Sequence, residues 1–210
     1  MQGLPDCKKR IVHSSSMLSR KRMKLRFITI TGILLFGILC GSIWQHSSLQ
    51  NTYLSYFAQQ YLQSCLSGSF LSVASSAFLS HVLLETVVLF FSFSCIGAPV
   101  LFCIPALYGI SIGGITAYLY TSFGMRGLLA NMILFLIPHI LSVCSLLVFV
   151  DSAICASSAL YKLNIKGNSF GTNSKMRLCF NRFIITLCGM LISSLLEGIL
   201  CAIFAPVLLK

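Results

Sequence analysis

The chain has 210 residues, of which 57% are hydrophobic and 9% are charged, and its mean hydropathy is +0.91. Roughly a quarter of the residues of a soluble domain are charged, so this composition excludes a soluble globular protein. It predicts an all-α, polytopic membrane protein. The formal net charge of +11 comes from basic residues in two blocks beside apolar stretches. Because such blocks are typical topology signals, we expect no binding to nucleic acid.

Residues 1–26 form a basic segment that we predict to be a cytoplasmic tail, and a first apolar stretch runs from Phe27 to Trp44. A basic segment before an apolar stretch is also how a secretory signal begins. The sequence WQHSSLQN that starts at Trp44 offers no cleavage site with small residues at the required spacing. We therefore predict that residues 27–44 are retained as the first membrane span.

The next segment, residues 45–79, is predicted to be an extracytoplasmic loop and contains no charged residue. Leu54, Phe57, Tyr61 and Cys65 recur in it at helical spacing, with Gln and Ser between them. This pattern predicts a short amphipathic helix that lies on the outer membrane surface or against a partner.

A transmembrane helix needs about 20 apolar residues, and four later stretches satisfy this requirement. They are residues 80–97, 100–120, 128–150 and 181–207, with a basic cytoplasmic loop at 151–180. Five spans place both basic blocks in the cytoplasm, with the amino terminus inside and the carboxyl terminus outside.

Two places interrupt these spans. Gly97, Ala98 and Pro99 are predicted to form a tight turn between the second and third spans. Pro138 interrupts the fourth span just before His139, which predicts a kink or a re-entrant half-helix.

Charged and polar side chains inside the spans are the candidates for chemistry. His81 and Glu85 share one helix face, which could suit a metal but lacks a second histidine, so we favour a hydrogen-bonded pair at the interface. Glu85 and Glu197 lie about 8 and 14 Å from the outer ends of their predicted spans. At similar depth they could bind a cation, or stay neutral and hydrogen-bond across helices. His139 could line a cavity or bond a carbonyl group that Pro138 leaves free.

The sequence contains no Walker motif, no intramembrane aspartate pair and no Cys/His zinc spacing among its ten cysteines. We therefore expect no catalytic residue, no metal site and no cofactor.

Small residues recur every fourth position in three spans, a spacing that lets helix backbones approach closely in lipid. The stripes are Gly37 and Gly41; Gly109, Gly113 and Ala117; and Ser194, Gly198 and Ala202. Because Glu197 lies beside the last stripe, we predict that it contributes to helix packing rather than to transport.

Several segments together resemble the stage II sporulation protein M family, from about Phe27 to the end of the chain. They are YFAQQYLQSCLSGSF, IGAPVLFCIPALYGISIGGITAYLYTSFGMRGLLANMILFLIPH and SSLLEGILCAIFAPVL. The family's Ile-Gly-x-Pro turn falls on Gly97 and Pro99, its glycine-containing span on Gly109 and Gly113, and its Gly-basic-Gly loop on Gly124, Arg126 and Gly127. Its Leu-x-Pro-His/Gln element falls on Pro138 and His139, and its final Glu and Pro on Glu197 and Pro206. Ile140 departs from the Asn or Gly that members often have.

The resemblance implies a non-enzymatic membrane scaffold of an endospore-forming bacterium. It would hold the peptidoglycan-degrading stage II sporulation proteins D and P at the septal membrane during engulfment. The alternative is a small multi-span transporter or channel with an intramembrane carboxylate site.

Overall fold

The computed structural model describes residues 5–47, 70–166 and 172–208, together with Tyr56, Gln60 and Gln63. These residues are helical except for a short turn at 93–96, which confirms the predicted all-α class. The elements are α1 (Pro5–Ser47), α3 (Phe70–Ser92), α4 (Gly97–Ala130), the π-helix η1 (Asn131–Leu136), α5 (Ile137–Lys166) and α6 (Thr172–Leu208). The residues on which the predicted amphipathic helix rests, Leu54, Phe57, Tyr61 and Cys65, lie outside the described residues.

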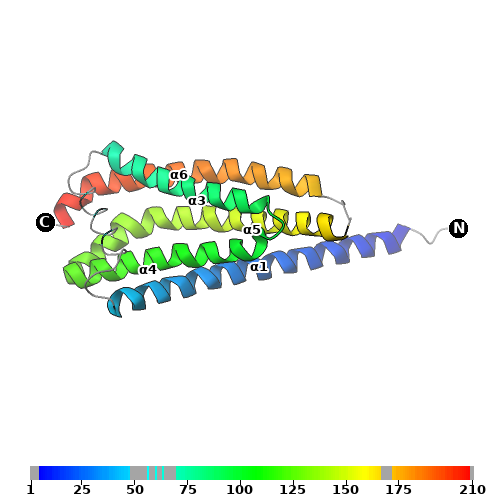
Figure 1. Ribbon diagram of the computed structural model, residues 1–210, viewed down its shortest axis with the longest axis horizontal. Coiled ribbons are helices and arrows are strands. Elements are labelled where there is room, and N and C mark those ends of the chain that lie inside the picture. Colours follow the sequence, from blue (N-terminus) through cyan, green and yellow to red (C-terminus); the bar gives the residue numbers. More distant parts are fainter. Residues whose placement is uncertain are drawn as a thin grey trace.

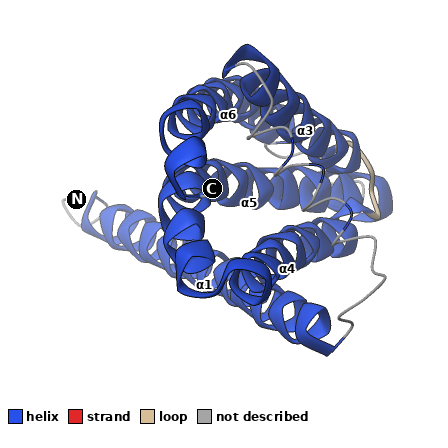
Figure 2. Ribbon diagram, turned by 90° about the vertical axis from the view of Figure 1, so that its left-hand side faces the viewer, coloured by secondary structure: helices blue, strands red, loops and turns tan. Residues whose placement is uncertain are grey.

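The helices form an elongated bundle with α5 at its centre (Figures 1 and 2). Buried side chains of α5, among them Leu146, Phe149 and Val150, pack against Ile30 of α1 and Met190 of α6. Large apolar side chains also cover the outside of the bundle, for example on α1, α3 and α6. An apolar exterior around a packed apolar interior is expected where lipid surrounds the helices.

Four helical stretches are long and apolar enough to cross a membrane. They are Met23–Gln45, Phe70–Ser92, Gly97–Ile165 and Thr172–Phe204. This supports a multi-pass membrane protein. The third stretch has 69 residues, far more than the roughly 20 that one crossing needs.

The long third stretch folds back on itself at Gly124, whose φ of 56° and ψ of −134° are non-helical. Only glycine adopts such dihedral angles at low cost. Beyond Gly124 the chain returns along α4: Gly127 lies against Leu119, and Asn131 Nδ2 donates a hydrogen bond to Thr116 Oγ1 at 3.2 Å. Helix α4 and the η1–α5 segment therefore form an antiparallel hairpin (Figure 1).

Helices α1 and α4 run parallel and approach closely through their glycine stripes. A Cβ on Gly37 would collide with the Ala106 carbonyl oxygen, and one on Gly113 would collide with that of Ile38. The Ser42 hydroxyl donates a hydrogen bond to the Gly113 carbonyl group at 3.2 Å. Because apolar helices gain little by leaving lipid, such backbone contact is a main source of attraction between them. The stripe of small residues on α6, which includes Gly198, faces α3, and Gly198 packs against Ala74.

Helix α3 begins at Phe70, ten residues before the predicted start of the second span at Ser80. The hydroxyls of Ser75, Ser76 and Ser80 bond carbonyl groups three or four residues earlier, at 3.0 to 3.1 Å, so this serine-rich segment satisfies its polar groups within the helix. The polar composition that suggested a loop is thus compatible with helix.

The turn between α3 and α4 lies at residues 93–96, and not at the predicted Gly97, Ala98 and Pro99. These three residues form the first turn of α4, where the missing N–H of a proline costs no hydrogen bond. Gly97 is buried against the Phe91 carbonyl group, and the Ser157 hydroxyl of α5 donates a hydrogen bond to the Ser94 carbonyl group at 2.7 Å.

Pro138 does not produce a re-entrant segment, because α5 continues through it to Lys166. The distortion is the preceding π-helix η1, which ends at Leu136. Widened π-helical turns are rare and occur often at functional sites. Here the π-helix precedes the proline, whose ring and missing N–H do not fit a regular α-helical interior.

We expect Gly113→Leu to disrupt the contact between α1 and α4, because the added side chain would meet the Ile38 backbone. The variant should insert into the membrane but show a lower abundance and a lower thermal unfolding temperature in detergent. Gly32→Leu is the matched control, since a Cβ at Gly32 meets no atom within 4 Å. Equal stability of the two variants would contradict this account of the glycine contact.

Candidate functional site: a cavity between the helices

A cavity of about 300 Å³ lies between α3 and α4, and residues of η1, α5 and α6 also line it. Its lining includes four side chains with acid–base or hydrogen-bonding groups: His81, Tyr108, His139 and Glu197. Three exposed serines add hydroxyl groups: Ser76, Ser80 and Ser111. Polar groups inside a membrane are costly unless they bond one another or a species that enters, so this cavity is the candidate functional site.

Three aromatic rings from three helices meet at the cavity. Tyr108 of α4 and His139 of α5 lie nearly parallel, with ring centroids 6.3 Å apart and an interplanar angle of 7°. The ring of His81 on α3 presents an edge to both, at 6.1 Å from His139 and 6.4 Å from Tyr108. These distances lie within the range of favourable aromatic contacts. The cluster exists only because the chain reverses at Gly124.

Hydrogen bonds hold the helices around the cavity. The hydroxyl groups of Tyr108 and Ser142 are 2.9 Å apart, which links α4 to α5. The Ser193 hydroxyl of α6 donates a hydrogen bond to the Pro138 carbonyl group at 2.6 Å, which links α6 to α5 at the start of that helix. Both bonds are between helices and partly or fully buried, so they fix the register of α5 against its neighbours.

Glu197 of α6 is 1% exposed and faces the same cavity as the three rings. Glu197 is buried because the small residue next to it, Gly198, lets α6 approach Ala74 of α3 closely. Glu197 therefore places a carboxyl group in a space that also contains a phenol and two imidazoles. Such a set of groups can exchange hydrogen bonds, bind a polar molecule of a few atoms, or hold a proton.

Glu85 and Glu197 do not lie at similar depth, so the alternative in which the two carboxylates bind one cation is wrong. Because α3 begins at Phe70, Glu85 lies about 22 Å along the helix from its amino-terminal end, whereas the prediction placed it about 8 Å from the end of its span. Glu85 instead lies beside Thr186 of α6, which is eleven residues before Glu197, or about 16 Å along the helix. The two carboxylates are therefore at different depths and do not share a site.

The predicted hydrogen-bonded pair of His81 and Glu85 is also absent, since the Glu85 carboxylate makes no hydrogen bond to His81. Glu85 is fully buried, whereas His81 turns toward Tyr108 and His139. Among the described residues, no group of three His, Cys, Asp or Glu side chains is placed to hold a metal ion.

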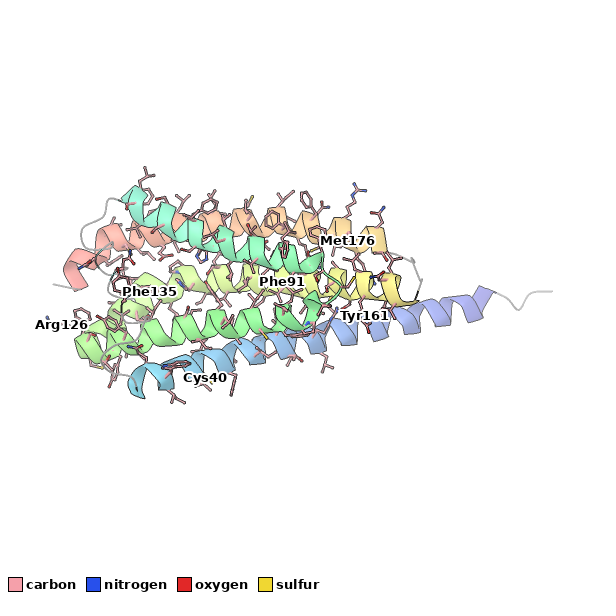
Figure 3. All side chains as sticks on the ribbon, viewed as in Figure 1. Cys40, Phe91, Arg126, Phe135, Tyr161 and Met176 are labelled. Atoms are coloured by element: carbon pink, nitrogen blue, oxygen red, sulfur yellow. The ribbon has the colours of Figure 1, made fainter. Side chains whose placement is uncertain are left out.

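The other predicted site residues do not line the cavity, although Pro138 adjoins His139 and its carbonyl group accepts the Ser193 bond. Gly97 and Pro99 begin α4, Gly109 and Gly113 contact α1, and Arg126 is exposed at the tip of the hairpin (Figure 3). These residues shape the bundle, and only His139 and Glu197 of the predicted set line the cavity.

Sequence reasoning missed Tyr108, Ser142 and Ser193. A tyrosine in the middle of an apolar stretch is a usable signal, because a buried phenol generally has a hydrogen-bond partner. The two serines carry no such signal, since serine is common in membrane helices and bonds its own backbone.

No protein-family model, curated protein or solved structure matches this chain.

We expect Glu197→Gln to preserve the protein level and function, because an amide keeps the shape and still donates and accepts hydrogen bonds. Glu197→Leu should lower both, since it leaves buried polar neighbours unsatisfied at a cost of about 1 to 3 kcal/mol. One measurement is the membrane abundance of the two variants, and the other is spore yield, the readout that the sequence resemblance implies. Full abundance of Glu197→Gln without function would show that the charge itself is needed, and would favour transport over packing.

Proposed function

We propose that the chain crosses the membrane five times, with its amino terminus in the cytoplasm and its carboxyl terminus outside. The hairpin at Gly124 divides the 69-residue stretch into two crossings, so that α1, α3, α4, α5 and α6 each cross once. Tyr161 and Met176 lie at one end of the bundle, and Arg126 lies at the other (Figure 3). Lys162 is next to Tyr161, and Lys175 is next to Met176. By the positive-inside rule, the end of the bundle that carries these basic residues is cytoplasmic.

Within this topology, the protein is a non-enzymatic scaffold that holds peptidoglycan-degrading enzymes at the septal membrane during endospore engulfment. The observation that supports this best is where the residues of the family resemblance lie. Gly97, Gly109, Gly113 and Gly127 are each in contact with a neighbouring backbone that leaves no room for a Cβ, and Gly124 forms the reversal. The shared residues thus specify a rigid arrangement of helices, which is what a platform for other proteins requires.

The enzymes that the scaffold would hold are the stage II sporulation proteins D and P, which act on the cell wall outside the membrane. Contact with them would therefore involve the outer end of the bundle. This end includes the hairpin tip near Arg126 and the amino-terminal turns of α3, where Phe70, Leu71 and Ser72 are exposed.

The alternative function is a small transporter or channel, and the observation that favours it is the cavity lined by His81, His139 and Glu197. The separation of Glu85 from Glu197 removes the paired carboxylates on which this alternative first rested. A single buried carboxyl group among aromatic rings and hydroxyls also fits interhelical bonding, so the scaffold is favoured.

Affinity isolation from sporulating cells tests the scaffold. We expect a tagged copy to gather at the septum and to co-isolate proteins D and P. Gly113→Leu, compared with Gly32→Leu at matched abundance, should retain less of both enzymes because the platform is distorted. A uniform distribution in the membrane, with neither enzyme recovered by the wild-type chain, would contradict the proposal. Proton or cation flux in proteoliposomes would then support the alternative.

A further inference from the structure

A second cavity, of about 370 Å³, lies between α1 and α6 with α5 as its floor. Its apolar lining comes from Phe27 and Ile28 of α1 and Val148 of α5. Its polar lining comes from Lys24 of α1, Asp151 of α5 and Arg182 of α6. We call this space the inner groove. It is separate from the polar cavity near Glu197, with which it shares no lining residue.

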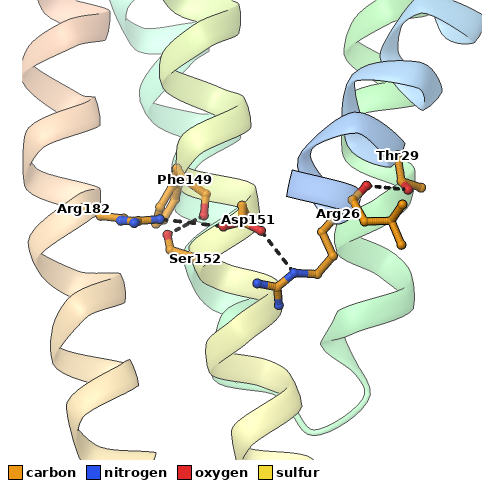
Figure 4. Close-up of polar contacts among 7 residues, drawn as sticks. Arg26, Thr29, Phe149, Asp151, Ser152 and Arg182 are labelled. Atoms are coloured by element: carbon orange, nitrogen blue, oxygen red, sulfur yellow. Dashed lines mark hydrogen bonds and ion pairs between the residues drawn. The ribbon is translucent and has the colours of Figure 1, made fainter. Parts of the chain in front are cut away.

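An arginine stands on either side of Asp151 in the inner groove (Figure 4). Arg26 Nε is 3.5 Å from Asp151 Oδ1, and an Arg182 guanidinium nitrogen is 3.9 Å from Oδ2. Charge-assisted hydrogen bonds between these groups are usually about 2.7 to 2.9 Å long. Both ion pairs are therefore loose, and Asp151 Oδ1 and Arg26 Nε are buried without a hydrogen-bond partner among the described residues.

The charges in the groove do not balance. Asp151 is the one carboxylate of the lining, whereas Lys24 and Arg182 line the groove as two cations and Arg26 adds a third beside Asp151. The Asp151 side chain is only 7% exposed, while those of Arg26 and Arg182 are 35% and 32% exposed. Each guanidinium has five N–H donors, so both arginines keep donors that face outward. The groove therefore presents an excess positive charge to its opening.

The groove lies where the apolar part of α1 begins, since Arg26 directly precedes Phe27. With the amino terminus in the cytoplasm, as proposed above, this is the level of the headgroups of the inner leaflet. Basic residues beside apolar surface at this level are the arrangement that recognises anionic lipids. A phosphate group would meet Lys24 and Arg182, and the adjoining acyl chain would lie on Phe27, Ile28 and Val148.

We propose that the inner groove binds one anionic phospholipid of the cytoplasmic leaflet. The phosphate oxygens accept hydrogen bonds from Arg182 and Lys24, and the phosphate charge offsets the positive charge that Asp151 alone does not balance. Because α1 and α6 both line this groove, the lipid also joins the first and last helices of the bundle. This inference rests on the proposed topology but not on the proposed scaffold role.

Lipid binding by the purified full-length chain tests this inference. The probes are phosphatidylglycerol, phosphatidylcholine and inorganic phosphate, added to delipidated protein in detergent. Bound lipid is counted by native mass spectrometry, and the thermal unfolding temperature is recorded alongside. We expect one molecule of phosphatidylglycerol to be retained in preference to phosphatidylcholine and to raise the unfolding temperature, while millimolar inorganic phosphate does not displace it.

Two substitutions locate the site. Lys24→Gln and Arg182→Gln should each weaken phosphatidylglycerol binding about fivefold, the effect of removing roughly one cation's attraction at a membrane surface. Arg177→Gln is the matched control, because it removes the same charge from an exposed position of the same helix. An equal loss with Arg177→Gln would overturn the proposal. Equal binding of both lipids by the wild-type chain would also overturn it, as would displacement of phosphatidylglycerol by inorganic phosphate. These two results do not depend on whether the variants fold. None of these results bears on septal localisation, which tests the scaffold separately.

Discussion

The reversal at Gly124 is the constraint on which the rest of the structure depends. A continuous α-helix over the 69 residues from Gly97 to Ile165 would extend for about 100 Å, more than three times the apolar thickness of a bilayer. At φ 56° and ψ −134°, Gly124 turns this stretch into a hairpin. Tyr108 and His139, 31 positions apart in sequence, then face each other at 6.3 Å instead of about 46 Å. The same reversal brings Asp151 of α5 next to Arg26 of α1.

Three kinds of contact hold the bundle together. Close backbone contact between the glycine stripes joins α1 to α4. Hydrogen bonds between hydroxyl and carbonyl groups join α5 to α4 and α6 around the polar cavity. Loose ion pairs join α1 and α6 to Asp151 at the basic end. In a membrane, an apolar side chain is as well shielded from water by lipid tails as by another helix. These specific contacts therefore determine which helices are neighbours.

The sequence was sufficient to predict an all-α protein with membrane-spanning helices, because apolar composition is a strong signal. It misplaced the start of α3, since hydropathy cannot distinguish a serine-rich loop from a helix whose serines bond their own backbone. That error of ten residues placed Glu85 near the outer surface, and so produced a carboxylate pair that does not exist. Proline 99 was likewise assigned to a turn, although the first turn of a helix accepts proline equally well.

The polar cavity could not be predicted from the sequence, because its lining depends on which helices pair with one another. His139 and Glu197 were recognised as unusual residues, but their meeting with His81 and Tyr108 requires the register of α5 against α4 and the distortion in η1. Neither can be obtained from the spacing of residues along one helix. The scaffold and the transporter remain distinguishable by experiment because they make different demands on the Glu197 charge.

The central structural claim, that α4 and α5 are two antiparallel spans joined at Gly124, is tested most directly by the accessibility of the hairpin tip. Met125 is 71% exposed, and Tyr161, at the opposite end of α5, is 47% exposed. In a chain whose native cysteines are replaced, Met125→Cys should react in intact cells with a thiol reagent that cannot cross the membrane. Tyr161→Cys should react only after the cells are permeabilised. Protection of Met125→Cys in both conditions would place the residue inside the bilayer and contradict the hairpin.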